Sequence, residues 1–350
     1  MSQEHGGIDH GTVLADGLHV YDFSANVNPW GYSPLVDKAV VSVKHQYYPD
    51  RYCNQLREVV AAHEGVEPDE VLCGNGATEL IWAVCRWAKG NKSKANPSVA
   101  TSNPTFGEYS SAVQRCGLNV HEYSTCADDA FRVNIASFAE FTSRRKPAVT
   151  FVCSPNNPTG QVLTNEEIEL IERAAYPGYV VLDQAYREYA ATEPIRHTNT
   201  LLRLCCLTKA YGLAGLRLGY LIGPAETLRE IARHIPPWTV SSAAQAAGIA
   251  ALTDQNWLNK TLHLRRRAAE TMHTLLLENC FEITSDGAGF FLVRAGNANE
   301  WRCRLYERGF AVRDCTSFGL PDHIRISAAQ PDASRLLIAA MILVRQELYD

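Results

Sequence analysis

Five short apolar runs alternate with helical patterns between residues 71 and 207, and this alternation constrains the fold more than any other feature. The runs cover residues 71–73, 99–101, 148–153, 179–182 and 202–207. Before the fourth run, Thr164 and Glu167 have the spacing of a capping box that starts a helix, and Pro177-Gly178 ends that helix. Because βαβ units show this alternation, the sequence predicts an α/β fold with a mainly parallel sheet.

The C-terminal part has a different pattern. Residues 256–279 read as one long helix, and we expect its basic triplet Arg265-Arg266-Arg267 to form a solvated face. Further short runs, at residues 281–284, 289–294, 311–313 and 323–326, predict strands of a smaller α+β domain. We therefore expect an extended N-terminal arm at 1–30 that belongs to the small domain and the active site, a large domain at 31–255 and a small C-terminal domain at 256–350.

Composition excludes several classes of protein. A formal net charge of −5 over 350 residues gives no general attraction for nucleic acid. No apolar run reaches the ~18 residues of a membrane span, and the polar N-terminus lacks the regions of a signal peptide, so we expect a cytoplasmic protein. The 11 cysteines show no Cys-x-x-Cys spacing, which favours free thiols over a metal site.

Lys209 follows the last apolar run of the predicted sheet, and Arg217 follows eight residues later among small residues. A lysine at the end of a buried strand is costly unless its amine is neutralised, paired or used covalently. An amine that bonds to an aldehyde cofactor removes that cost, and the arginine offers a fork of donors to a phosphate. Taken alone, the lysine could equally be a solvated residue beyond a strand.

Other runs end in residues that complete such a site. Gly74-Asn75-Gly76 follows a strand and opens a helix, whose free N–H groups suit one phosphate. Phe106 and Asn157 follow two further strands, while Asp183 ends a fourth and Tyr186 comes three residues later. A carboxylate at a buried strand end requires a cationic partner. Singly, these residues have plainer interpretations as a turn, a core ring or a turn amide.

An aldehyde acceptor, a stacking ring, a carboxylate for a protonated ring nitrogen and a phosphate cradle together describe pyridoxal phosphate. The chain resembles the fold-type I, aspartate-aminotransferase-like pyridoxal-phosphate enzymes over nearly its whole length. The motifs that carry this resemblance are Gly74-Asn75-Gly76, Pro104-Thr105-Phe106, Asn157-Pro158-Thr159-Gly160, Asp183-x-x-Tyr186, Lys209 and Arg217. The resemblance implies a large domain with a mainly parallel sheet and a smaller α+β C-terminal domain.

It also implies roles for individual residues. Lys209 would bond covalently to the cofactor, Asp183 would keep its pyridine nitrogen protonated, and Phe106 would stack on its ring. Asn157 and Tyr186 would contact the ring oxygen. No metal is implied.

The phosphate of the cofactor would be held by Gly76, Ala77, Thr78, Thr208 and Arg217. Tyr48 matches the tyrosine that reaches the phosphate in the neighbouring subunit, so the resemblance implies a homodimer with shared active sites. One departure is Cys206, which stands where these enzymes usually carry Ser or Thr. Because a thiol is a poorer donor, we expect weaker cofactor binding or a substitute donor.

Within this family the chain is similar to the L-threonine O-3-phosphate decarboxylases of cobalamin biosynthesis. The similar segments are His5-Gly6-Gly7, residues 22–29, Pro237-Trp238-Thr239-Val240, Val312-Arg313-Asp314-Cys315 and Ile324-Arg325-Ile326. The similarity implies a small phosphorylated amino acid substrate, decarboxylated to (R)-1-aminopropan-2-yl phosphate and CO₂. His5, Asn26 and Arg313 would bind the substrate phosphate, while Arg325 would take the carboxylate and Asn157 would also contact the substrate.

Some positions depart from that pattern. Trp30 replaces a typical Leu, Ser241 replaces an Asn, and Ser327-Ala328-Ala329 lacks a further arginine. Phosphoserine or a phosphonate analogue therefore remains an alternative substrate. An aminotransferase of the histidinol-phosphate type is the alternative reaction.

Overall fold

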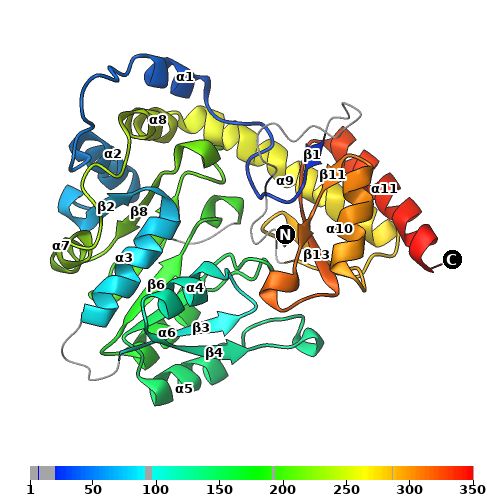
Figure 1. The fold of residues 1–350 in the computed structure, drawn as a ribbon, viewed down its shortest axis with the longest axis horizontal. Helices are drawn as coiled ribbons and strands as arrows, with labels where there is room; N and C mark the ends of the chain where they lie inside the picture. Colours follow the sequence, from blue (N-terminus) through cyan, green and yellow to red (C-terminus); the bar gives the residue numbers. More distant parts are fainter. Residues whose placement is uncertain (1–6, 8–19, 91–96, 191–193, 286, 350) are drawn as a thin grey trace.

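The structure is a computed structural model that describes residue 7 and residues 20–90, 97–190, 194–285 and 287–349. A seven-stranded sheet dominates the described chain (Figure 1). In spatial order its strands are β2 (Val71–Gly74), β8 (Gly219–Ile222), β7 (Leu201–Cys206), β6 (Tyr179–Asp183), β5 (Val149–Cys153), β3 (Ser98–Asn103) and β4 (Asn119–Ser124). Neighbouring strands are parallel except around β8, which is antiparallel to both β2 and β7. The predicted α/β fold with a mainly parallel sheet is confirmed.

Helices cover both faces of this sheet. They are α1 (Pro34–Val41), α2 (Asn54–Glu64), α3 (Gly76–Gly90), α4 (Glu108–Arg115), α5 (Ile135–Arg145), α6 (Asn165–Ala175), α7 (Ala225–Ala232) and α8 (Ser242–Thr253). Because alternate strand residues point to opposite faces, Leu202 and Leu204 pack with α3 and α4, while Val180 and Leu182 pack with α5 and α6. Thr164 caps α6 as its sequence predicts.

Two strands of the seven-stranded sheet are not predicted from the sequence. β4 is an edge strand of the sheet, paired only with β3 among the described strands, and half of its residues are exposed. An edge strand needs few apolar residues, so its sequence gives a weak signal. β8 is only four residues long and comes directly after the loop that carries Arg217.

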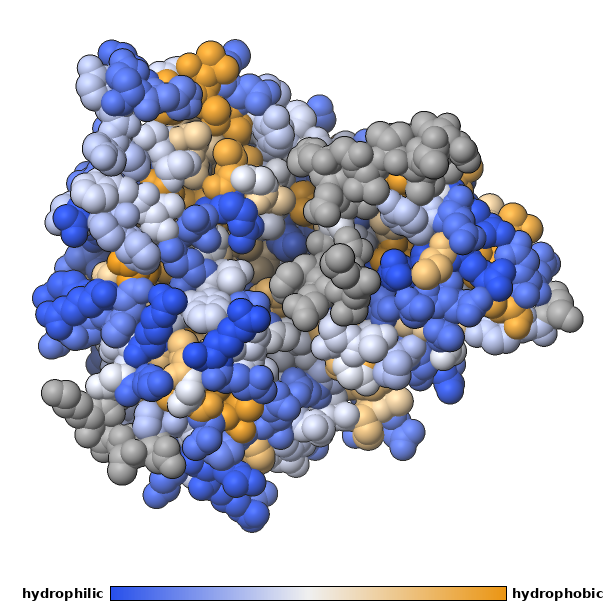
Figure 2. Space-filling view, viewed as in Figure 1, coloured by the Kyte–Doolittle hydropathy of each residue, from blue (hydrophilic) through white to orange (hydrophobic). Residues whose placement is uncertain are grey.

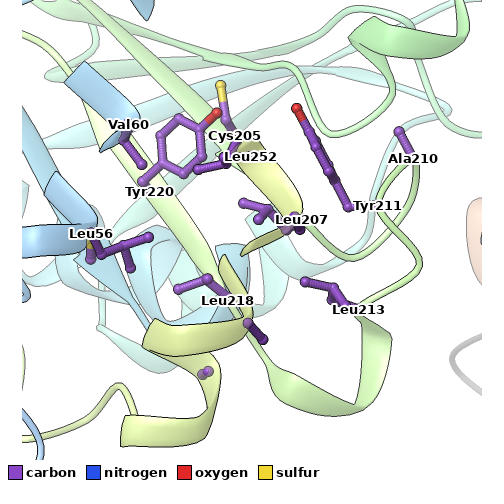
Figure 3. Close-up of a cluster of buried hydrophobic side chains, with 14 of the residues drawn as sticks. Leu56, Val60, Cys205, Leu207, Ala210, Tyr211, Leu213, Leu218, Tyr220 and Leu252 are labelled. Carbon is purple, nitrogen blue, oxygen red and sulfur yellow. The ribbon is translucent and has the colours of Figure 1, made fainter. Parts of the chain in front are cut away.

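An apolar cluster lies behind the turn that carries Lys209. Tyr211, Leu213 and Leu218 pack there against Leu56 and Val60 of α2 (Figure 3). All five side chains are buried, and each fully buried aliphatic side chain contributes roughly 1.5–3 kcal/mol. Leu207 precedes the lysine and belongs to the same cluster, so apolar residues on both sides of Lys209 fix the loop after β7.

The C-terminal part forms a second sheet in the order β12 (Arg313–Asp314), β13 (His323–Ser327), β10 (Phe290–Arg294) and β9 (Ile283–Thr284), all antiparallel. Beside it lie α10 (Ala298–Glu307), α11 (Pro331–Tyr349) and the parallel pair β1 (Tyr21–Asp22) and β11 (Phe310–Ala311). Phe23 follows β1 and packs into the same apolar cluster as Trp301. The described end of the predicted arm thus packs on the C-terminal sheet.

The long helix α9 (Gln255–Glu278) runs from the larger part of the fold to the C-terminal part (Figure 1). Our expectation that its arginine triplet forms a solvated face is wrong for Arg265, which is 2 % exposed. The guanidinium of Arg265 lies 3.3 Å from the ring centroid of Tyr189 and donates to the carbonyls of Ala288 and Gly289, each at 3.0 Å. Helical periodicity places one member of any such triplet toward the core.

Short 3₁₀ segments complete the description: η1 (Pro68–Glu70), η2 (Ala127–Asp129), η3 (Arg187–Tyr189), η4 (Ala214–Leu216) and η5 (Thr316–Phe318). Polar residues cover much of the face shown in Figure 2, and apolar side chains gather over α1 and α8. Among the described helices, none has the length and apolar character needed to cross a bilayer.

Candidate functional site

A cavity of about 540 Å³ opens between the carboxyl ends of the large-sheet strands and the C-terminal sheet. Ligands of open α/β sheets bind at this edge. The predicted site residues that line the cavity are Ala77, Thr78, Phe106, Asn157, Asp183, Tyr186, Thr208, Lys209, Arg217, Arg313 and Arg325. Segments distant in sequence are thus brought to one place, although the fold alone does not assign their roles.

The wall formed by the start of α3 has the shape of an anion cradle. Gly76, its first residue, has φ +76°, and a Cβ there would lie 2.6 Å from Nη2 of Arg217. The backbone of Gly219 lies close to the start of α3, since a Cβ on Gly219 would lie 2.8 Å from the backbone nitrogen of Ala77. Glycine at both positions lets a guanidinium and a helix N-terminus converge, which is a donor set that suits a phosphate.

Asp183 lies at the base of the cavity and is 3 % exposed. Its Oδ1 accepts from the backbone N–H of Ala185 at 2.9 Å, and its Oδ2 accepts from the hydroxyl of Tyr109 at 2.6 Å. Burial raises the pKa of Asp183, and the two hydrogen bonds and the charge of Lys209 oppose that rise. A buried carboxylate in this position would be stabilised by a cation such as a protonated ring nitrogen.

Lys209 and Tyr186 lie on the adjacent wall. Nζ of Lys209 is 5.6 Å from the ring centroid of Tyr186. The carbonyl of Lys209 accepts from the N–H groups of Asn28, at 2.9 Å, and Gly212, at 3.2 Å, which fixes its backbone. An amine on a fixed backbone can bond to an aldehyde bound in the same cavity.

Two thiols also line the cavity. Cys206, the departure noted in the sequence, and Cys153 both border it. Burial raises the pKa of each thiol, so both stay protonated at neutral pH. Thr208 lines the same cavity and offers a hydroxyl two residues after Cys206.

Two arginines of the C-terminal sheet complete the opposite wall. Arg325 is 4 % exposed, donates to Oδ1 of Asn157 through Nη1, and donates to the carbonyl of Ser24 at 2.5 Å through Nη2. Arg313 is equally buried and donates to the hydroxyl of Ser317 at 2.6 Å. The two arginines lie directly opposite each other in the register of β12 and β13.

A buried charge cluster lies behind the cavity and is a feature that sequence reasoning missed. Glu64, at the end of α2, accepts from Arg187 at 2.5 and 3.0 Å, from Arg203 at 2.8 Å and from the hydroxyl of Tyr220 at 2.8 Å. The exposed fractions of the Glu64, Arg187 and Arg203 side chains are 5, 12 and 9 %. Arg187 follows the cavity residue Tyr186, so the cluster anchors the chain beside the site. Arg203 interrupts an otherwise apolar strand, which was the available signal.

Two predicted residues, Asn26 and Tyr48, do not line the cavity, and a third cannot be placed. His5 lies outside the described residues. Asn26 is fully buried and does not line the cavity, and its side-chain amide has no hydrogen-bond partner among the described residues. Tyr48 is 83 % exposed and lies against Trp238, outside the cavity of its own chain.

The cavity also contains residues that we did not predict. Glu108, Ser111 and Arg115 line it from α4, at spacings of three and four residues. This spacing places them on one helical face, and it was the signal that a periodicity search would have used.

A lysine held beside a buried carboxylate and a phosphate cradle defines the class of protein as an enzyme that carries a phosphorylated aldehyde cofactor. The sequence matches the family described as aminotransferase class I and II over residues 23–343, and the chain belongs to this family. Pyridoxal 5′-phosphate is the cofactor of the family, so the predicted cofactor is confirmed. The chain is therefore a pyridoxal-phosphate-dependent enzyme.

Curated relatives match the chain over most of its length. A histidinol-phosphate aminotransferase of Geobacillus sp. (strain WCH70) is 33% identical over 94% of this chain and 91% of its own length. Another histidinol-phosphate aminotransferase, from Anoxybacillus flavithermus, is 30% identical over 95% of this chain and 90% of its own.

Solved structures share the fold. The L-threonine-O-3-phosphate decarboxylase of Porphyromonas gingivalis superposes with a TM-score of 0.79 at 24% identity, covering 93% of this chain and 99% of that one. The histidinol-phosphate aminotransferase of Sinorhizobium meliloti, solved in complex with pyridoxal-5′-phosphate, gives a TM-score of 0.82 at 22% identity, covering 98% and 99%. At these identities the likeness establishes the fold.

Proposed function

We propose that this protein is a pyridoxal-phosphate-dependent decarboxylase that converts L-threonine O-3-phosphate to (R)-1-aminopropan-2-yl phosphate and CO₂. The observation that carries the proposal is the pair Arg313 and Arg325, which face each other across β12 and β13 and line one cavity. A substrate with a carboxylate and a phosphate offers one anion to each guanidinium. Arg325 would bind the carboxylate and Arg313 the phosphate.

Each residue of the cavity has a defined task in this proposal. Pyridoxal phosphate, when bound, supplies an electron sink for the electron pair left at Cα. The two arginines would hold the carboxylate and the phosphate of the substrate, and this orientation would select the Cα–carboxylate bond as the one that breaks. Lys209 returns a proton to Cα after CO₂ leaves. Asp183 would keep the ring nitrogen of the cofactor protonated, and Asn157 and Tyr186 would contact its ring oxygen.

Transamination is the second candidate reaction, and the names of the curated relatives favour it. The same residues would serve if the cavity instead turned the Cα–H bond perpendicular to the ring. Histidinol phosphate has a phosphate but no carboxylate, so it would engage only one of the two arginines at a time.

We also propose that the functional unit is a homodimer in which Tyr48 of the partner subunit reaches the phosphate cradle. The exposure of Tyr48 supports this, because its ring would otherwise lie in water. Leu35 and Val41 of α1 are also exposed, at 44 and 84 %.

One experiment separates the two reactions. The protein is incubated with pyridoxal phosphate and L-phosphothreonine in the absence of any 2-oxo acid, and CO₂ is followed together with the cofactor spectrum. Catalytic release of CO₂ is the expected result. Stoichiometric conversion to the pyridoxamine form, with turnover only after 2-oxoglutarate is added, would establish the aminotransferase instead.

Matched arginine variants test the substrate assignment. Arg313→Gln should raise the KM for phosphothreonine by about 10- to 100-fold, because a charge-assisted hydrogen bond contributes roughly 1.5–3 kcal/mol. Arg294→Gln is the control, because Arg294 is exposed and pairs only with Glu282 among the described residues. Equal KM values for the two variants would refute the phosphate role of Arg313.

A further inference from the structure

Tyr109 lies just behind the cavity, in the first turn of α4, and is 1 % exposed. Its ring stacks on Phe151, with centroids 4.8 Å apart and planes at 6°. Its edge meets the ring of Phe106, with centroids 5.6 Å apart and planes at 88°. Packing on two sides leaves the side chain one orientation, so the position of its hydroxyl is fixed.

That hydroxyl donates to Oδ2 of Asp183 at 2.6 Å, while the backbone of Ala185 donates to Oδ1. Burial and the charge of Asp183 raise the pKa of Tyr109, so the hydroxyl keeps its proton and remains a donor. A carboxylate has about four acceptor positions, so two remain for another donor. A short hydrogen bond to a charged acceptor is among the stronger interactions in a protein interior.

We propose that Tyr109 is the positioning residue of the cofactor site: its hydroxyl keeps Asp183 ionised and correctly oriented, and its ring sets the angle of Phe106. The inference rests on the proposed function for the assignment of Asp183 and Phe106 to the cofactor ring. The side chain of Tyr109 thereby contacts both Asp183 and Phe106. The protonation of the ring nitrogen, and with it the strength of the electron sink, depends on a residue outside the cavity.

Removal of the hydroxyl has a defined consequence. Asp183 loses a donor to its charged form, so the neutral carboxyl is favoured. A neutral carboxyl is a weaker partner for a protonated ring nitrogen, so the nitrogen holds its proton less well. The ring of a phenylalanine at 109 would keep both aromatic contacts, so any change reports on the hydroxyl.

The test is Tyr109→Phe in the full-length holoenzyme, reconstituted with ¹⁵N-labelled pyridoxal phosphate. Tyr179→Phe is the matched control: Tyr179 begins β6, the strand that ends at Asp183, and its hydroxyl pairs with Thr227 at 3.2 Å. We expect Tyr109→Phe to move the ring-nitrogen signal toward the unprotonated position and to weaken cofactor binding about tenfold. Tyr179→Phe should leave both unchanged, and equal behaviour of the two variants would overturn the proposal.

Two further arms separate the possible failures. In an Asp183→Asn background, Tyr109→Phe should not shift the nitrogen signal further, and an undiminished shift would also refute the mechanism. If Tyr109→Phe does not fold, 3-fluorotyrosine at 109 keeps the shape with a stronger donor, and the nitrogen signal should then move in the opposite direction. A wild-type protein that binds the cofactor but releases no CO₂ refutes the proposed reaction and leaves the Tyr109 result intact.

Discussion

Replacing Glu64 with glutamine should destabilise the protein by about 3 kcal/mol at pH 7. Burial would raise the pKa of Glu64, but the hydrogen bond from Arg187, the charges of Arg187 and Arg203 and the hydroxyl of Tyr220 outweigh it and lower the pKa from 4.5 to about 2. At 1.36 kcal/mol per pKa unit, a difference of ~2.5 units corresponds to about 3 kcal/mol. Removing one partner of a buried ion pair independently gives a loss of about 3–5 kcal/mol.

The sign of the pH dependence follows from the depressed pKa. The stabilisation from Glu64 is fully present above its unfolded pKa of 4.5 and is lost as pH falls through the folded value of about 2. The difference between wild type and Glu64→Gln should therefore be constant from pH 8 to 6 and fall by roughly half at pH 3.

Urea denaturation followed by tryptophan fluorescence measures this difference at pH 8, 7, 6 and 3. Glu58→Gln is the control, since Glu58 lies on the same helix but is exposed, and we expect a change within about 0.5 kcal/mol. A loss below about 1 kcal/mol for Glu64→Gln, or a loss that grows as the pH falls, would refute the reasoning.

Three further predictions follow from described contacts. Gly76→Ala should weaken cofactor binding at least about tenfold, because φ of Gly76 is +76° and the added Cβ would lie 2.6 Å from the guanidinium of Arg217. Titration of the apoprotein with pyridoxal phosphate measures the affinity, and an unchanged affinity would contradict the phosphate cradle. Arg265→Met should lower the free energy of unfolding by about 3 kcal/mol, because the carbonyls of Ala288 and Gly289 and the ring of Tyr189 lose their cationic partner. Urea denaturation measures this change, and a loss under about 1 kcal/mol would contradict the prediction. Mixed dimers of Lys209→Ala and Tyr48→Ala should regain activity that neither variant shows alone, and no regain on subunit exchange would rule out shared sites.

Sequence reasoning found those site residues that carry a charge and stand at the end of an apolar run. Asp183 and Lys209 were recognisable because a charged residue at the end of an apolar run has few physical explanations, and the structure lines one cavity with both. The Glu64 cluster was not recognisable, because its members are brought together only by the packing of α2 against the sheet. Arg265 was misjudged because three adjacent arginines look alike until the helix orientation is known.

Tyr109 was overlooked for a related reason. Phe106 drew attention as an aromatic residue just beyond a strand, whereas Tyr109 is three residues further into a helix and reads as core. Its contact with Asp183 joins residues 74 positions apart, and no local pattern encodes a pairing of that kind.

The thiols of Cys153 and Cys206 line the cavity together with Lys209, so they could compete with its amine for the cofactor aldehyde. Sulfur nucleophiles also add to aldehydes, so two cysteines beside the cofactor are potential competitors of Lys209. Addition requires the thiolate, and burial keeps both cysteines in the neutral form. The burial that keeps these two thiols neutral would therefore limit their addition to the aldehyde and leave Lys209 as the nucleophile of the site.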